Sequence, residues 1–148
     1  MNAKNRSLGA LVLLIGAALL LVQRHEIAAR TGAGLALQGI AVLLMIWARL
    51  TFGIRSFHAT ANPTEGGLVT NGPYRYWRHP IYAAVLLFVW TGVLTQGGPP
   101  AVDALALAGI ATVMTAIRIQ AEEQLLLASM PEYAAYAART KRLVPFVF

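Results

Sequence analysis

The chain has 148 residues, of which 57% are hydrophobic and only 12% are charged. A typical soluble domain is about 45–50% apolar and about 25% charged, so this composition excludes an ordinary soluble domain and a disordered chain. It predicts an integral membrane protein. The sequence contains no cysteine, which excludes disulfides and thiolate chemistry.

Four apolar runs predict an all-α integral membrane protein with four transmembrane helices. We expect the spans at about 7–23, 33–54, 81–96 and 101–119. A span needs about 20 residues, so four spans leave little of the chain for a separate soluble domain. We therefore treat residues 1–148 as one membrane domain, with a loop over 55–80 and C-terminal helices and a tail over 120–148.

The distribution of basic residues predicts the orientation. Of the 12 lysines and arginines, Arg24 and Arg30 lie between the first two spans, and none lies between the last two. All the others fall on the opposite side, which the positive-inside rule assigns to the cytoplasm. We expect a bacterial inner-membrane protein with both termini cytoplasmic, so that the 55–80 loop and the tail can meet. The same rule explains the net charge of +6 without a nucleic-acid partner.

The tail is expected to be helical in two parts. Residues 118–127 continue the fourth span as a helix. Ser129 and Glu132 then have the spacing of a capping box, with Pro131 in the first turn. A second helix is predicted to start near Ser129. The i, i+3, i+7 spacing of Tyr133, Tyr136 and Thr140 places these three residues along one face of that helix.

Metal and nucleotide motifs are missing from the sequence. The three histidines are His25, His58 and His79, and no pair of them has the spacing of a zinc site. There is no P-loop and no glycine fingerprint after a strand. We therefore expect no protein-bound metal ion, and any nucleotide-like cofactor would need a pocket made by helices and the loop.

Two groups of charged residues have both an ordinary and a functional interpretation. Glu122 and Glu123 could form a solvated helix face, but carboxylates near an anionic bilayer surface are better placed facing a cationic partner. Arg75, Arg78 and His79 could serve only topology, or could bind an anionic group or a polar cofactor. Their aromatic neighbours suit either a membrane-interface belt or stacking on an adenine ring and a sulfonium; they are Tyr74, Tyr76, Trp77 and Tyr82.

Two segments resemble the isoprenylcysteine carboxyl methyltransferase family and the related phospholipid N-methyltransferases. The first is residues 67–82, with the core Arg78-His79-Pro80-x-Tyr82. The second contains Glu122-Glu123-x-x-Leu126, Tyr133-x-x-Tyr136 and Arg142-Leu143-Val144-Pro145. Ala84 stands where the family usually has glycine, and Met130-Pro131 occupies another glycine region. Because the chain is short, we do not carry over a prenylated-protein substrate.

The resemblance implies methyl transfer from S-adenosyl-L-methionine to a lipophilic acceptor, such as an isoprenoid or a lipid, at the cytoplasmic membrane face. It implies catalytic roles for Arg78 and Glu122, which would orient a carboxylate acceptor or remove a proton from an amine. Glu122 or Glu123 would pair with the ammonium or ribose hydroxyls of the cofactor. The positions implied to bind the cofactor are Tyr74, Arg78, His79, Pro80, Tyr82, Glu122, Glu123, Tyr133, Tyr136 and Pro145.

Two other functions are compatible with the sequence. An NADPH-dependent membrane reductase of the sterol-reductase type has a similar Arg-His-Pro-x-Tyr segment, although asparagine often follows its His-Pro pair, where this chain has Ile81. A non-enzymatic small four-span protein, such as a scaffold, is the other alternative. The sequence does not identify the methyl acceptor or the oligomeric state.

Overall fold

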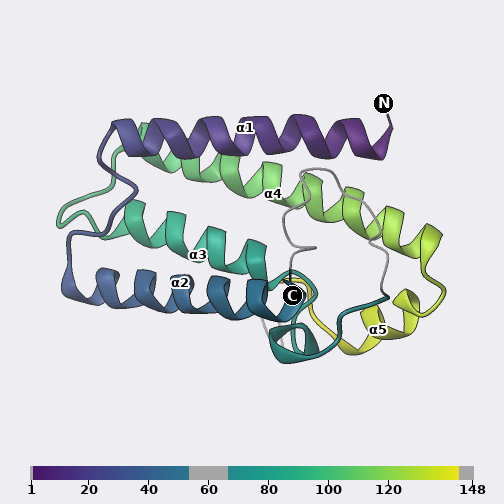
Figure 1. Ribbon diagram of the computed structural model, residues 1–148. Coiled ribbons are helices and arrows are strands. Elements are labelled where there is room, and N and C mark those ends of the chain that lie inside the picture. Colours follow the sequence, from purple (N-terminus) through teal and green to yellow (C-terminus); the bar gives the residue numbers. More distant parts are fainter. Residues whose placement is uncertain (1, 54–66, 144–148) are drawn as a thin grey trace.

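The computed structural model describes residues 2–53 and 67–143, and the chain is helical in these ranges (Figure 1). The predicted all-α class is confirmed there. The only extended pairing in the same ranges is an isolated parallel bridge between Trp77 and Lys141. The elements in chain order are α1 (Ala3–Gln23), α2 (Gly32–Phe52), the short 3-10 helix η2 (Gly72–Arg75), α3 (Pro80–Leu94), α4 (Val102–Ser129) and α5 (Tyr133–Arg139).

The four long helices are arranged as two pairs. Figure 1 shows α1 beside α4 and α2 beside α3, and contacts between α3 and α4 join the pairs. The best-packed core lies where α1, α3 and α4 meet, and Ile27, Val85 and Trp90 pack against its edge. This core consists of Leu21, Val89, Val93, Ala104 and Ala108. The alanines of α4 let its neighbours approach closely, as small residues do in membrane bundles.

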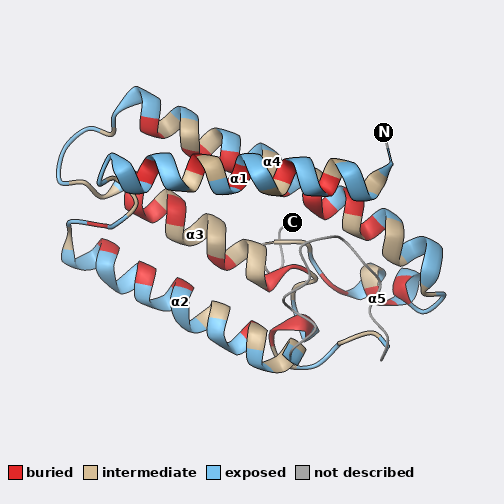
Figure 2. Ribbon diagram, turned by 45° about the horizontal axis from the view of Figure 1, so that its top comes forward, coloured by how far each residue is buried: buried red, intermediate tan, exposed pale blue. Residues whose placement is uncertain are grey.

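Three helices in the described ranges are long and apolar enough to cross a membrane: α1, α2 and α4. Helix α3 is apolar but has only 15 residues, so it is about 22 Å long, against a hydrocarbon core of about 30 Å. Much of the outer surface of α1 and α2 is exposed (Figure 2) and carries large apolar residues such as Leu13, Leu43 and Leu50. A bilayer would solvate this surface.

The helix bounds differ from the expected spans at several points. Helix α1 begins at Ala3 and not Ser7. Helix α2 ends at Phe52, because Gly53 leaves the helix with a φ of 73°, a conformation that glycine adopts without steric cost. Residue 54 and the first part of the predicted loop lie outside the described residues. Helix α4 continues as one helix from Val102 to Ser129, which confirms the expected helical extension beyond the fourth span.

The predicted capping box at Ser129 is wrong. The Ser129 hydroxyl donates to the carbonyl oxygen of Leu125 at 2.7 Å, so it serves the last turn of α4 and does not cap a new helix. Met130 is extended, with φ −127° and ψ 103°, as expected for a residue before proline. Helix α5 starts only at Tyr133, and the Glu132 side chain makes no capping hydrogen bond.

One end of the bundle is closed by side-chain amides that bind loop carbonyls. Gln38 of α2 accepts from the Ala29 N–H at 3.0 Å and donates to the carbonyls of Ile27 at 2.7 Å and Phe88 at 3.0 Å. Gln96 donates to the carbonyls of Glu26 at 3.1 Å and Ala28 at 3.0 Å. These amides satisfy buried backbone groups that would otherwise be costly in a membrane.

The opposite end of the bundle contains the segments that the distribution of basic residues predicts on one side of the membrane. The start of α1, the end of α4 and helix α5 all lie at this end (Figure 1). The chain just before α3 pairs with the chain just after α5, since the Arg78 N–H donates to the Lys141 carbonyl at 2.7 Å. The expected meeting of the loop and the tail is therefore confirmed for the described residues.

A substitution at Gly92 of α3 tests how closely the connection between α1 and α2 packs against α3. A Cβ atom added at this position would lie 2.7 Å from the carbonyl carbon of Ile27 and closer still to its oxygen. We expect Gly92→Ala to lower the free energy of unfolding by about 1–3 kcal/mol, the usual cost of overpacking. Denaturant unfolding in detergent, followed by circular dichroism, measures this loss.

Gly109→Ala in α4 is the matched control, because a Cβ atom there meets nothing within 4 Å. This control is expected to be neutral or to stabilise the helix by up to about 1 kcal/mol. Equal stabilities for the two variants would contradict the close approach of Ile27 to α3.

Candidate functional site

The candidate site is built on a short parallel pairing between the segment before α3 and the segment after α5. The Lys141 N–H donates to the Tyr76 carbonyl at 3.1 Å, and the His79 N–H donates to the Arg142 carbonyl at 3.1 Å. Pro80 opens α3 immediately afterwards and is buried; proline suits a first helical position because its missing N–H would have no partner there. Backbone hydrogen bonds thus fix the start of α3 against the tail.

A buried ion pair joins these two segments to α4. The Nε atom of Arg78 donates to Oε1 of Glu123 at 2.9 Å, and both side chains are only 10% exposed. Arg142 donates to the other oxygen of Glu123 through Nε at 3.0 Å and Nη2 at 2.9 Å. Glu123 therefore lies between two guanidinium groups and does not belong to a solvated helix face.

Arg78 also holds the end of α5. Its Nη1 atom donates to the carbonyl oxygens of Ala137, at 2.8 Å, and Thr140. The last carbonyls of a helix have no partner within the helix, and Arg78 supplies one. Arg78 is thus engaged by α4 and α5 together, so its contacts make it a residue that joins elements.

His79 lies between the two glutamates. It is 6% exposed, and its Nε2 atom lies 3.3 Å from Oε1 of Glu123. Its Nδ1 atom faces Oε2 of Glu122 at 3.8 Å, which is beyond hydrogen-bond distance. Since a carboxylate only accepts, Nε2 is the atom that donates to Glu123, and Nδ1 is turned toward Glu122.

Glu122 is the more accessible of the two glutamates, with 21% of its side chain exposed. The Tyr82 hydroxyl donates to its Oε1 atom. Arg118, one turn earlier on α4, lies 3.4 Å from the same oxygen and donates to the Tyr82 oxygen at 2.8 Å. Arg118 and Glu122, four residues apart on α4, are therefore in contact, and Tyr82 of α3 bonds to both.

Two tyrosines of α5, Tyr133 and Tyr136, contribute buried side chains beside the site. Tyr133, Tyr136 and Thr140, which were expected along one helix face, are all buried. The Tyr136 hydroxyl donates to the Tyr74 carbonyl at 2.7 Å, and burial raises the pKa of Tyr136 to about 12, so its hydroxyl keeps its proton. The Tyr133 hydroxyl is buried with no hydrogen-bond partner among the described residues.

The structure thus brings most of the sequence-predicted site residues to one end of the bundle. Arg78, His79, Tyr82, Glu122 and Glu123 form one continuous set of polar contacts. Tyr74 is buried and contacts Phe52 through its ring, with centroids 5.4 Å apart. Pro145 lies outside the described residues, so its expected role is untested.

Two arginines make contacts that the sequence analysis does not predict. Arg142 pairs with Glu123, and Arg118 donates a hydrogen bond to Tyr82. Arg142 belongs to a family motif with no assigned partner, and Arg118 lies at the end of the fourth expected span. Both fall on the side of the acidic pair, which is the available signal; the partner of each depends on three-dimensional packing.

Glu123→Gln tests the central ion pair. The substitution keeps the size of the side chain but leaves the buried guanidinium of Arg78 without a counter-charge, which costs about 3–5 kcal/mol of unfolding free energy. Denaturant unfolding in detergent measures the loss. Glu132→Gln makes the same chemical change at an exposed position and should have almost no effect; equal losses would contradict the structural role of Glu123.

Comparisons with known proteins identify the family of the chain. The family model described as phospholipid methyltransferase matches residues 29–130. The cobalt-zinc-cadmium resistance protein CzcN of Cupriavidus metallidurans is 38% identical over 79 residues, which are 53% of this chain and 35% of that protein. The chain therefore corresponds to about a third of that relative's length. No solved structure matches significantly. Because the family match covers more than half of the chain, including α2, α3 and α4, the protein belongs to the phospholipid methyltransferase family of membrane proteins.

Proposed function

We propose that the protein transfers a methyl group from S-adenosyl-L-methionine to a lipophilic acceptor at the cytoplasmic membrane face. One observation carries the proposal: the bundle has a polar cluster with a partly exposed carboxylate at one end and an apolar cavity lined by residues of α1, α2 and α3. Family membership supports methyl transfer, and the geometry supports an acceptor that is apolar over most of its length.

The residues of the cluster fit S-adenosyl-L-methionine. The cofactor carries an ammonium, ribose hydroxyls and an adenine ring, which need acceptors and aromatic surfaces. Glu122 supplies an accessible carboxylate, and Tyr82 supplies a ring 5.8 Å from the His79 imidazole. Glu123 and Arg78 are fully engaged with each other, so we assign them to holding the site.

Methyl transfer depends mainly on the alignment of the reacting atoms. The bound cofactor supplies an electrophilic methyl group on a sulfonium. An in-line displacement then requires the acceptor atom, carbon and sulfur to be held in order, and such positioning is worth about 7–11 kcal/mol in favourable cases. The Tyr82 ring is an appropriate neighbour for a cation. Glu122 is the carboxylate placed to accept a proton from an amine or hydroxyl acceptor.

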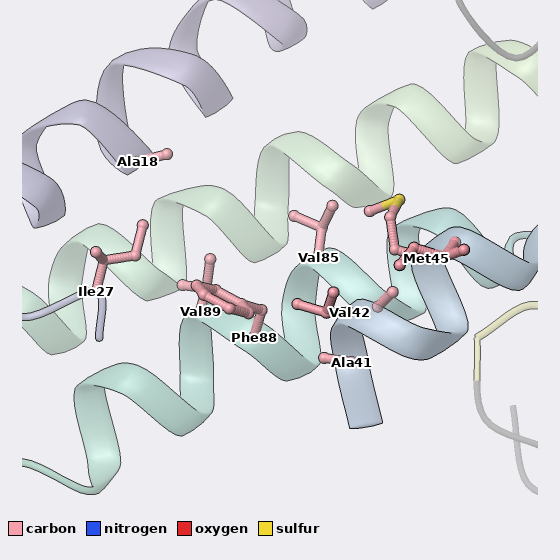
Figure 3. A pocket seen from close by; sticks show the side chains of 10 residues that line it. Ala18, Ile27, Ala41, Val42, Met45, Val85, Phe88 and Val89 are labelled. Atoms are coloured by element: carbon pink, nitrogen blue, oxygen red, sulfur yellow. The ribbon is translucent and has the colours of Figure 1, made fainter. Parts of the chain in front are cut away.

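The cavity suits the hydrocarbon part of the acceptor. It has a volume of about 300 Å³, the lower end of the range for ligand pockets, and Figure 3 shows its side chains converging from α1, α2 and α3. Its wall includes Ala84 and Val85, which follow Tyr82 within one turn of α3. The lining residues are Ala18, Ile27, Ala41, Val42, Met45, Ile46, Ala84, Val85, Phe88 and Val89.

The cytoplasmic placement of the site follows from the charges around it. Lys4, Arg75, Arg139 and Lys141 are exposed on elements at the same end of the bundle as the cluster (Figure 1). The positive-inside rule assigns this end to the cytoplasm, where S-adenosyl-L-methionine would be supplied. With α3 counted as a short fourth span, the start of α1 and the tail at residues 141–143 are both assigned to this side.

The name of the related protein states a role in cobalt, zinc and cadmium resistance for that protein. Within residues 2–53 and 67–143, no group of three or more His, Asp or Glu side chains is placed to hold a metal ion.

A labelled-methyl assay tests the proposal. Membranes containing the protein are incubated with methyl-labelled S-adenosyl-L-methionine and a total lipid extract, and the organic phase is analysed by mass. We expect label in a lipophilic product. Glu122→Gln should lower the rate by about a hundredfold, the lower range for loss of a general acid–base group.

Arg24→Ala is the matched control, because this exposed arginine pairs with Asp103 at the other end of the bundle and such pairs contribute little. Its rate should equal that of the wild type. An organic phase without label above that of membranes lacking the protein would contradict the proposed function, as would an unaffected Glu122→Gln variant.

A further inference from the structure

Arg118 is a charged side chain buried where α1, α3 and α4 meet. It is 4% exposed and lies on α4, one helical turn before Glu122. A buried guanidinium has a high desolvation cost unless it is well paired. The fold must therefore provide this arginine with strong partners.

Each nitrogen of the Arg118 guanidinium reaches a different helix. Nε donates to the Tyr82 hydroxyl oxygen of α3 at 2.8 Å. Nη1 donates to the Ser7 carbonyl of α1 at 2.9 Å. Nη2 donates to Oε1 of Glu122, on α4 itself, at 3.4 Å. The planar fork of arginine suits this three-way arrangement, whereas the single ammonium of lysine does not.

These contacts fix the orientations of the Tyr82 hydroxyl and the Glu122 carboxylate. Because the Tyr82 oxygen accepts from Arg118, its own proton is directed to Oε1 of Glu122. Oε1 of Glu122 thus receives donors from both Arg118 and Tyr82. The other oxygen, Oε2, is left facing Nδ1 of His79 at 3.8 Å. The orientation of the accessible carboxylate therefore depends on Arg118.

The stabilisation of α4 by an i, i+4 ion pair does not explain why an arginine is buried at position 118. An arginine four residues before a glutamate is the less favourable order of an i, i+4 pair, and such pairs contribute only a few tenths of a kcal/mol. Those values apply to exposed side chains, and Arg118 is buried. Its contact with Ser7 also reaches α1, which lies outside the family-matched residues 29–130.

We infer that Arg118 is a positioning residue for the reaction, which holds the Tyr82 hydroxyl and the Glu122 carboxylate in place and uses α1 as its third anchor. Helix α1 then takes part in shaping the site. The inference rests on the proposed function, because it assigns Tyr82 and Glu122 to the binding of the cofactor.

A double-mutant cycle tests the inference. Isothermal titration calorimetry in detergent measures the Kd of S-adenosylhomocysteine for the wild type, Arg118→Lys, Tyr82→Phe and the double variant. We expect each single change to weaken binding by about tenfold. Because residues in contact give non-additive losses, the double variant should also be weakened by only about tenfold to thirtyfold. Arg24→Lys, at the other end of the bundle, is the control and should bind as the wild type does.

The outcomes separate the possibilities. A hundredfold loss in the double variant would show independent effects and overturn the inference, as would an Arg118→Lys variant that is less stable but binds normally. If Arg118→Lys does not fold, Arg118→Gln replaces it in the cycle; failure of both to fold would make Arg118 a purely structural residue and overturn the inference. Absence of binding by the wild type would overturn the proposed function as well, whereas normal wild-type binding with additive losses overturns this inference alone.

Discussion

The buried ion pair between Arg78 and Glu123 is the interaction on which the rest of the site depends. It joins the segment before α3 to α4, and Arg142 extends it to the tail. Arg78 also donates to carbonyls at the end of α5. Three parts of the chain that are distant in sequence are thereby held at one end of the bundle. Removing either partner would leave an uncompensated charge in a poorly hydrated place, which is far more costly than losing a surface pair.

This arrangement gives the two adjacent glutamates different tasks. Both carboxylate oxygens of Glu123 are paired, with two arginines and His79, so its contacts hold α4 to the segment before α3 and to the tail. Glu122 is more exposed and is oriented by Tyr82 and Arg118. A helix turns by about 100° per residue, so neighbouring positions point in different directions. One carboxylate therefore faces the tail while the other faces α3 and remains available to a ligand.

The sequence predicted the large features because they depend on composition and charge. The apolar runs indicated the helices, and the scarcity of basic residues between spans one and two indicated which segments share a face. Helical spacing placed Tyr133 and Tyr136 on one face, and both are buried in the structure. These features are set locally or by the bilayer, so no knowledge of packing was needed.

The features that were missed depend on tertiary packing. The capping box failed because the Ser129 hydroxyl found a closer acceptor within α4. The partners of Arg78 and Arg118 lie on other helices, so spacing along the chain could not assign them. The catalytic role expected for Arg78 stays a prediction, since its contacts show that it joins α4 and α5 to the segment before α3.

Ultraviolet cross-linking of radiolabelled S-adenosyl-L-methionine to the detergent-purified protein tests the central claim most directly. Peptide mapping of the cross-linked protein locates the bound cofactor along the chain. The account predicts that the label lies within residues 74–82 or 122–142 and that S-adenosylhomocysteine displaces it while NADPH does not. Label confined to the opposite end, in residues 24–31 or 95–101, or displaced only by NADPH, would contradict it.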